Sequence, residues 1–154
     1  MKAAELREEI AVDLQGLQAT VDELLTLQHD IADRSPTVRE KTAAAAFLAQ
    51  FYNGIENILK RISVYQQVSL PTGETWHIEL FQRFCSPPHP GLPELFHDKL
   101  ASALAPYRRF RHVAFHSYAF QLDWSRMAEG VGSIEDVFSQ FKAGLYDYLD
   151  KISA

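Results

Sequence analysis

The chain has 154 residues, a length typical of one domain built around one hydrophobic core. Apolar residues make up 47% and charged residues 23%, which excludes the compositions of disordered, collagen-like and membrane-spanning proteins. The formal net charge of −5 argues against broad, sequence-independent binding to nucleic acid, which needs many phosphate contacts, so a polyanion would have to meet a local basic patch.

Three further features concern the compartment of the protein. The longest purely apolar run, 43–49, is far shorter than the roughly 20 residues of a membrane span, and charged residues from Glu5 onward leave no apolar stretch typical of a signal peptide. The single cysteine, Cys85, cannot form an internal disulfide. We therefore expect a cytoplasmic protein that does not contact a membrane, folded as a single domain over residues 1–154.

Two long helices are predicted in the first half of the chain. Apolar residues recur at spacings of three and four over 3–32, the pattern of an amphipathic helix: Leu6, Ile10, Leu14, Leu17, Val21, Leu24, Leu25 and Ile31. Ser35-Pro36 interrupts the pattern, and Thr37 can cap a second helix over 38–65. Because the connection is short, we expect the two helices to be antiparallel.

The second half predicts shorter helices separated by turns. A turn at 71–74 precedes a short third helix, the proline-rich segment 86–93 is a loop, and helical spacing resumes over 94–104 until Pro106 kinks or restarts the helix. Gly130 and Gly132 are expected to separate residues 122–124 from a last helix that Ser133 caps. No segment alternates in the manner of a strand, so the predicted fold is an all-α antiparallel bundle of about five to six helices.

The densest group of titratable side chains lies in the segment 107–118. It contains a basic cluster of three arginines and three further candidates for chemistry: Arg108, Arg109, Arg111, His112, His116 and Tyr118. The other histidines, His77 among them, are isolated along the sequence, and none is assigned a catalytic role. We therefore place the candidate site in this segment.

Arg111 and His116 have the chemistry of a metal-free ribonuclease. A histidine that titrates near neutrality can take the proton of a ribose 2′-hydroxyl, while a guanidinium binds the phosphate and stabilises its developing charge. Five residues along a continuous helix, the two side chains point about 140° apart, so they share a site only if the helix bends or ends between them or a partner completes the pocket. A homodimer with the motif at its interface would satisfy this geometry.

The spacing of these residues resembles a known signature. Arg111-His112, three intervening positions, His116, one position and Tyr118 look like the Arg-polar-x(3)-His-x-Tyr motif of the HEPN superfamily, and within it of the HepT-like toxins. Two landmarks of HepT-like chains accompany the motif, 70–77 before it and Leu122-Asp123-Trp124 after it. The resemblance covers most of the chain and implies a HEPN-like helical domain.

The resemblance also implies an activity and partners. Arg111 and His116 correspond to the ribonuclease pair of a dimeric toxin that cleaves transfer RNA or messenger RNA, and His112 corresponds to the polar residue for which many relatives have Asn or Asp. Arg108 and Arg109 would contact RNA. The family's partner is a minimal nucleotidyltransferase antitoxin that adds AMP to the motif tyrosine, here Tyr118. Added bulk and negative charge would then block RNA entry.

Two alternatives remain at this point. His112 and His116 share a helical face and could bind a metal with Asp123 or His97 as third ligand, although no His-Glu-x-x-His pattern is present and we expect no metal or cofactor. The second alternative is a non-catalytic helical subunit that binds a nucleotide or substrate for a nucleotidyltransferase. The acidic net charge is compatible with that function.

Overall fold

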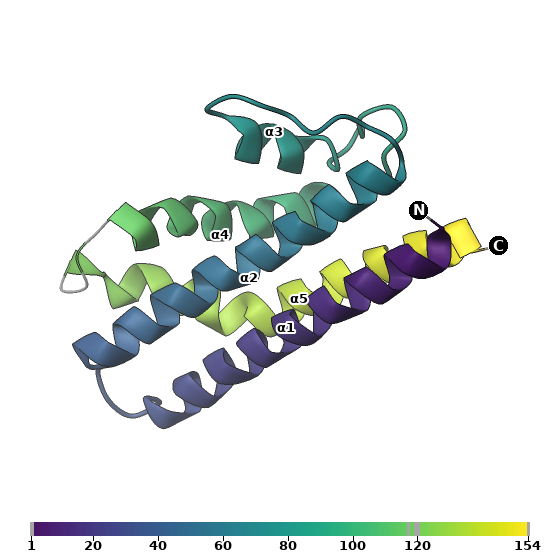
Figure 1. The fold of residues 1–154 in the computed structure, drawn as a ribbon. Coiled ribbons are helices and arrows are strands. Elements are labelled where there is room, and N and C mark those ends of the chain that lie inside the picture. The colour runs from purple at the N-terminus through teal and green to yellow at the C-terminus, as the bar shows by residue number, and fades with distance from the viewer. Residues whose placement is uncertain (1, 117, 119–120, 154) are drawn as a thin grey trace.

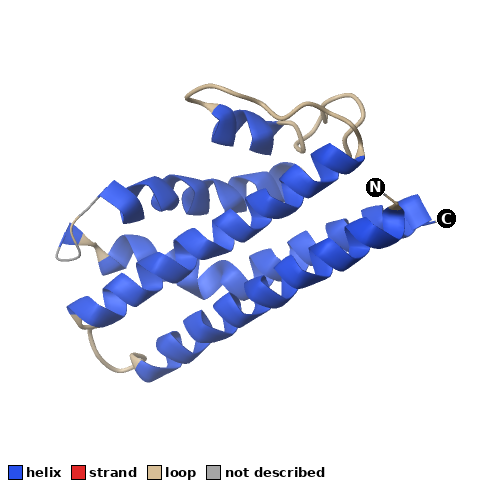
Figure 2. Cartoon of the chain, in the orientation of Figure 1, coloured by secondary structure: helices blue, strands red, loops and turns tan. Residues whose placement is uncertain are grey.

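The computed structural model describes residues 2–116, 118 and 121–153, and the regular elements of this part are all helices (Figures 1 and 2). They are α1 (Ala3–Asp30), α2 (Val38–Tyr65), α3 (Trp76–Gln82), α4 (Asp98–His116) and α5 (Trp124–Ser153). The predicted all-α bundle is confirmed, with five helices in the described residues. The bounds of α2 agree with the predicted helix over 38–65.

The four long helices lie side by side and alternate in direction along the chain, while the short α3 covers one side of the bundle (Figure 1). α1 packs along α2 and α5, and α2 also contacts α3 and α4. The start of α1 and the end of α5 lie together, where the Arg7 guanidinium donates to Asp150 Oδ1 at 2.9 Å and to Ser153 Oγ at 2.8 Å. None of the described helices is long and apolar enough to cross a membrane.

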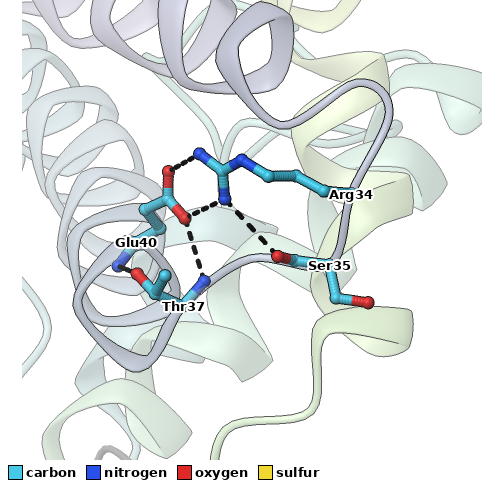
Figure 3. Close-up of polar contacts among 4 residues, drawn as sticks. All are labelled: Arg34, Ser35, Thr37 and Glu40. Carbon is cyan, nitrogen blue, oxygen red and sulfur yellow. Dashed lines mark hydrogen bonds and ion pairs between the residues drawn. The ribbon is translucent and has the colours of Figure 1, made fainter.

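The start of α2 is fixed by a capping box (Figure 3). Thr37 Oγ1 accepts from the Glu40 backbone N–H at 3.2 Å, and Glu40 Oε1 accepts from the Thr37 N–H at 2.9 Å. These bonds satisfy backbone donors that have no partner within a helix's first turn. The predicted cap at Thr37 is therefore confirmed, and it ends the turn that reverses the chain between α1 and α2.

The core fills the space between the helices and includes a set of aromatic side chains. Phe51 of α2, fully buried, lies 5.4 Å from the Tyr107 ring of α4 and 6.0 Å from the Phe138 ring of α5, measured between ring centroids. Phe96 stacks on Phe81 of α3 at 4.7 Å. Phe81 also lies 6.4 Å from the Tyr52 ring of α2, so aromatic contacts attach α3, α4 and α5 to the central helix α2.

The prediction of a helix over 94–104 is wrong at its start. The backbone N–H groups of Leu95 and Phe96 both donate to the Phe84 carbonyl, at 3.0 and 3.1 Å, so this segment is bound to the end of α3 and α4 begins at Asp98. Pro106 does not end α4, which continues to His116. The neighbouring Tyr107 is buried, and this tertiary packing outweighs the hydrogen bond that a proline removes.

The predicted start of the last helix at Ser133 is also wrong, because α5 begins at Trp124 and runs through Gly130 and Gly132. Asp123 Oδ1 accepts from the Ser125 N–H at 3.0 Å at the first turn. The Tyr107 hydroxyl donates to the Gly130 carbonyl at 2.6 Å. Packing against α4 thus keeps this stretch helical, although its glycines alone would favour a turn.

Candidate active site

A cleft of about 700 Å³ lies between α4 and the segment that begins α3. Its lining residues come from the turn before α3, from α3 and from the second half of α4: Glu74, Thr75, His77, Ile78, Arg108, Arg109, Arg111, His112 and His116. Arg111 and His116 therefore line the same cleft of a single chain. The segment 74–78 lies across from α4, so both positions face the cleft although they are about 140° apart around the helix.

The Arg111 guanidinium is anchored at the wall of this cleft. Its Nε donates to Asn53 Oδ1 of α2 and lies 3.8 Å from Glu56 Oε1. Its Nη1 lies 3.2 Å from Nε2 of His77. Only 27% of the Arg111 side chain is exposed. Residues of α2 and α3 therefore hold the guanidinium to which the motif assigns phosphate binding.

His112 and His116 lie one turn apart at the end of α4, and their ring centroids are 4.4 Å apart. Both side chains are exposed, so His116 is not a histidine buried in the core. An exposed imidazole beside an anchored guanidinium can reach a ligand in the cleft. This arrangement suits acid–base chemistry on a bound phosphodiester.

The other candidate residues of the segment 107–118 differ in their exposure. Arg108 is half-buried, with its Cζ atom 5.2 Å from the centroid of the Phe81 ring, whereas Arg109 is exposed at the cleft. Tyr118 lies two residues beyond the end of α4 and is 72% exposed. Ser117, between His116 and Tyr118, lies outside the described residues. The Tyr118 side chain is thus accessible from the solvent.

Sequence reasoning missed three residues of this site: Asn53, Glu56 and His77. His77, isolated along the sequence, has its Nδ1 atom 2.6 Å from Glu56 Oε2. A signal was present in α2, since Glu56 lies about one turn from Tyr52 and Leu59 in a helix whose buried residues are mostly apolar. A carboxylate at such a position needs a partner, and the sequence did not identify which one.

The described residues hold no group of three or more histidine, cysteine, aspartate or glutamate side chains that could bind a metal ion. Of the two third ligands considered, His97 accepts the Leu100 N–H through Nδ1 at the start of α4, at the other end of that helix from His116. Asp123 binds Ser125. The described residues therefore do not assemble the alternative metal site built on His112 and His116.

A comparison with protein families gives a match to a family model described as HepT-like protein, over residues 43–152. This chain belongs to the HepT-like family. The resemblance read from the motif is thereby confirmed at the level of the family, within the HEPN superfamily. No curated protein and no solved structure gave a significant match. The matched range of this HepT-like chain contains the whole cleft and excludes α1.

Proposed function

We propose that this HepT-like chain is a toxin-type, metal-independent ribonuclease that acts in the cleft between α3 and α4. The observation that carries the proposal is that Arg111 and His116, the ribonuclease pair of the motif, line one cleft in one chain. Membership of a family of HEPN nucleases supports it. The basic residues of α4 give an acidic protein a local site for a polyanion.

The chemistry needs no metal. His116, as general base, takes the proton of a ribose 2′-hydroxyl, and the 2′-oxygen attacks the adjacent phosphorus while the bond to the 5′-oxygen breaks. Arg111 binds the non-bridging oxygens and stabilises their charge. The leaving oxygen takes a proton from a general acid. Protonated His112 is available for this role, because its ring centroid lies 4.4 Å from that of His116. The products are a 2′,3′-cyclic phosphate and a 5′-hydroxyl.

The substrate would be transfer RNA or messenger RNA, bound by Arg108 and Arg109 through the phosphates beside the scissile one. We further propose that the active form is a homodimer with the motif near its interface, as the resemblance implies. DNA would not be cleaved, because it has no 2′-hydroxyl to attack the phosphorus.

Control of this activity would act through Tyr118. Its 72% exposure makes the hydroxyl accessible to a nucleotidyltransferase antitoxin, and a transferred AMP would add one negative phosphodiester and an adenosine close to the basic cleft. RNA would then be repelled and obstructed. Tyr118→Phe should therefore cleave RNA and resist neutralisation.

The decisive experiment incubates purified wild-type protein, Arg111→Ala and His116→Ala with total RNA in EDTA, followed by gel analysis and mapping of the end groups. Wild-type protein should leave cyclic phosphate ends, and each variant should cleave at least about 100-fold more slowly, the usual contribution of a positioned acid–base group such as His116 and of a group that stabilises developing charge such as Arg111. His29→Ala, an exposed histidine in the last turn of α1, serves as the control and should match wild type.

Other outcomes would reassign the protein. Cleavage that chelation abolishes would favour the metal-binding alternative for His112 and His116. Intact RNA with folded, unmodified protein would contradict the ribonuclease and favour the nucleotide-binding or substrate-binding subunit of a nucleotidyltransferase.

A further inference from the structure

A buried carboxylate and a histidine lie directly behind Arg111. Glu56, in the middle of α2, is only 3% exposed, and it contacts both His77 and Arg111. We propose that Glu56 and His77 are positioning residues that fix the Arg111 guanidinium in the cleft, with the His77 Nδ1–H donating to Glu56. This inference rests on the proposed function, in which Arg111 binds the scissile phosphate.

The protonation of His77 Nδ1 follows from its contact with Glu56. Glu56 Oε2 lies 2.6 Å from Nδ1, and because a carboxylate only accepts hydrogen bonds, Nδ1 must carry the proton. Arg111 Nη1 lies 3.3 Å from Nδ1 and 3.2 Å from Nε2, so it lies against the imidazole ring and not along the lone pair of either nitrogen. His77 thus donates to Glu56, and its ring supports the Arg111 guanidinium.

The guanidinium is held from two further directions. Asn53 Oδ1, one turn before Glu56 on α2, accepts from Arg111 Nε, and Glu56 Oε1 supplies a negative charge 3.8 Å from the same atom. Contacts from α2 and α3 therefore fix a side chain that is rooted on α4. A group fixed before substrate arrives does not have to be ordered during the reaction, which is the basis of preorganised catalysis.

The His77 ring is itself held in orientation. The Trp76 ring lies against it with centroids 3.4 Å apart and ring planes tilted by 32°, and the Lys60 ammonium lies 4.5 Å from the centroid of the Trp76 ring. Glu56 of α2 and Arg111 of α4 thus contact His77 directly, and Lys60 of α2 contacts the ring beside it. A buried carboxylate is costly unless it is paired, so Glu56 depends on its contacts with His77 and Arg111.

The kinetic test compares His77→Ala and the isosteric Glu56→Gln with wild type in the same cleavage assay. We expect kcat to fall at least 10-fold in each with KM nearly unchanged, and His77→Asn, whose amide can donate to Glu56 from close to the position of Nδ1, to recover part of the loss. In the Arg111→Ala background the His77→Ala substitution should have no further effect, because its action passes through Arg111. Cleavage equal to wild type in both single variants, or additive losses, would overturn the proposal.

A second measurement does not depend on activity. Nitrogen NMR of wild-type protein at neutral pH should show His77 protonated at Nδ1, and the Arg111 Nε–H signal should exchange with water at least 10-fold faster in His77→Ala and Glu56→Gln. His29→Ala should leave it unchanged. An Nε2–H tautomer, or an unaltered Arg111 signal, would overturn the positioning role. If this result holds while no RNA is cleaved, only the proposed function fails.

Discussion

At the turn between α1 and α2, one glutamate serves two partners. Glu40 belongs to the capping box of α2, and its carboxylate also accepts two hydrogen bonds of 2.7 Å from the Arg34 guanidinium. The Arg34 bonds, followed by that from the Thr37 N–H, lower the pKa of Glu40 from 4.5 to about 2. The ionised form of Glu40 thus stabilises the start of α2.

The lowered pKa predicts a pH dependence of stability. Because the folded pKa lies below the unfolded one, Glu40 stabilises the fold fully above about pH 4.5, and this contribution is lost as the pH falls toward 2. Glu40→Gln should therefore lower the thermal midpoint at pH 7 and have a progressively smaller effect below pH 4.5. Thermal unfolding followed by circular dichroism measures the difference. Glu135 is exposed on α5 and serves as the control. If Glu135→Gln lowered the thermal midpoint equally and with the same pH dependence, this assignment would be contradicted.

Two glycines, one on each of the packed helices α1 and α2, occupy different surroundings. At Gly54 of α2, an added Cβ atom would lie 2.6 Å from Cδ2 and 2.9 Å from Cγ of the buried Leu17 on α1. At Gly16 of α1, an added Cβ atom would meet nothing within 4 Å. The close approach of α1 to α2 therefore depends on Gly54 and not on Gly16.

This difference predicts opposite signs for the same substitution. Gly16→Ala should stabilise the protein by up to about 1 kcal/mol, the gain in helix propensity. Gly54→Ala has the same gain but overpacks the contact with Leu17, which costs about 1–3 kcal/mol, so the net result should be destabilising. Urea unfolding measures both. In a Leu17→Ala background, Gly54→Ala should become stabilising, and persistence of the loss there would exclude the contact as its cause.

At the scale of the whole molecule, the position of α4 depends on the core behind it. Phe51 contacts both Tyr107 of α4 and Phe138 of α5, and Tyr107 in turn donates its hydroxyl proton to the Gly130 carbonyl. Burial raises the pKa of Tyr107 well above its usual range, as expected of a hydroxyl inside the core. The helix that carries Arg111 and His116 is therefore attached through one aromatic cluster.

Removal of the central ring should weaken the whole fold. Phe51→Ala should lower the free energy of unfolding by about 3–5 kcal/mol, the usual loss for a buried phenylalanine. Val12→Ala, at a position 65% exposed on α1, should change it by no more than about 0.5 kcal/mol. Urea unfolding at neutral pH measures both values. A loss below 1 kcal/mol for Phe51→Ala would show that the cluster does not attach α4.

The sequence by itself determined the features that depend on near neighbours in the chain. Apolar spacing gave the two long helices, and Thr37 with Glu40 determined the start of α2, because capping is a contact over three residues. The motif in α4 also indicated the candidate site and the family, since its residues lie within eight positions of one another. All of this information is local.

Only the tertiary structure decided what depends on residues distant in sequence. Packing of Tyr107 against Gly130 keeps α5 helical through its glycines, against local propensity. Glu56 and His77, 21 positions apart, meet each other and Arg111 only because α2, α3 and α4 come together. The sequence indicates that a buried carboxylate is costly, but it does not identify the cation that pairs with it. Long-range contacts are fixed by packing and not by spacing along the chain.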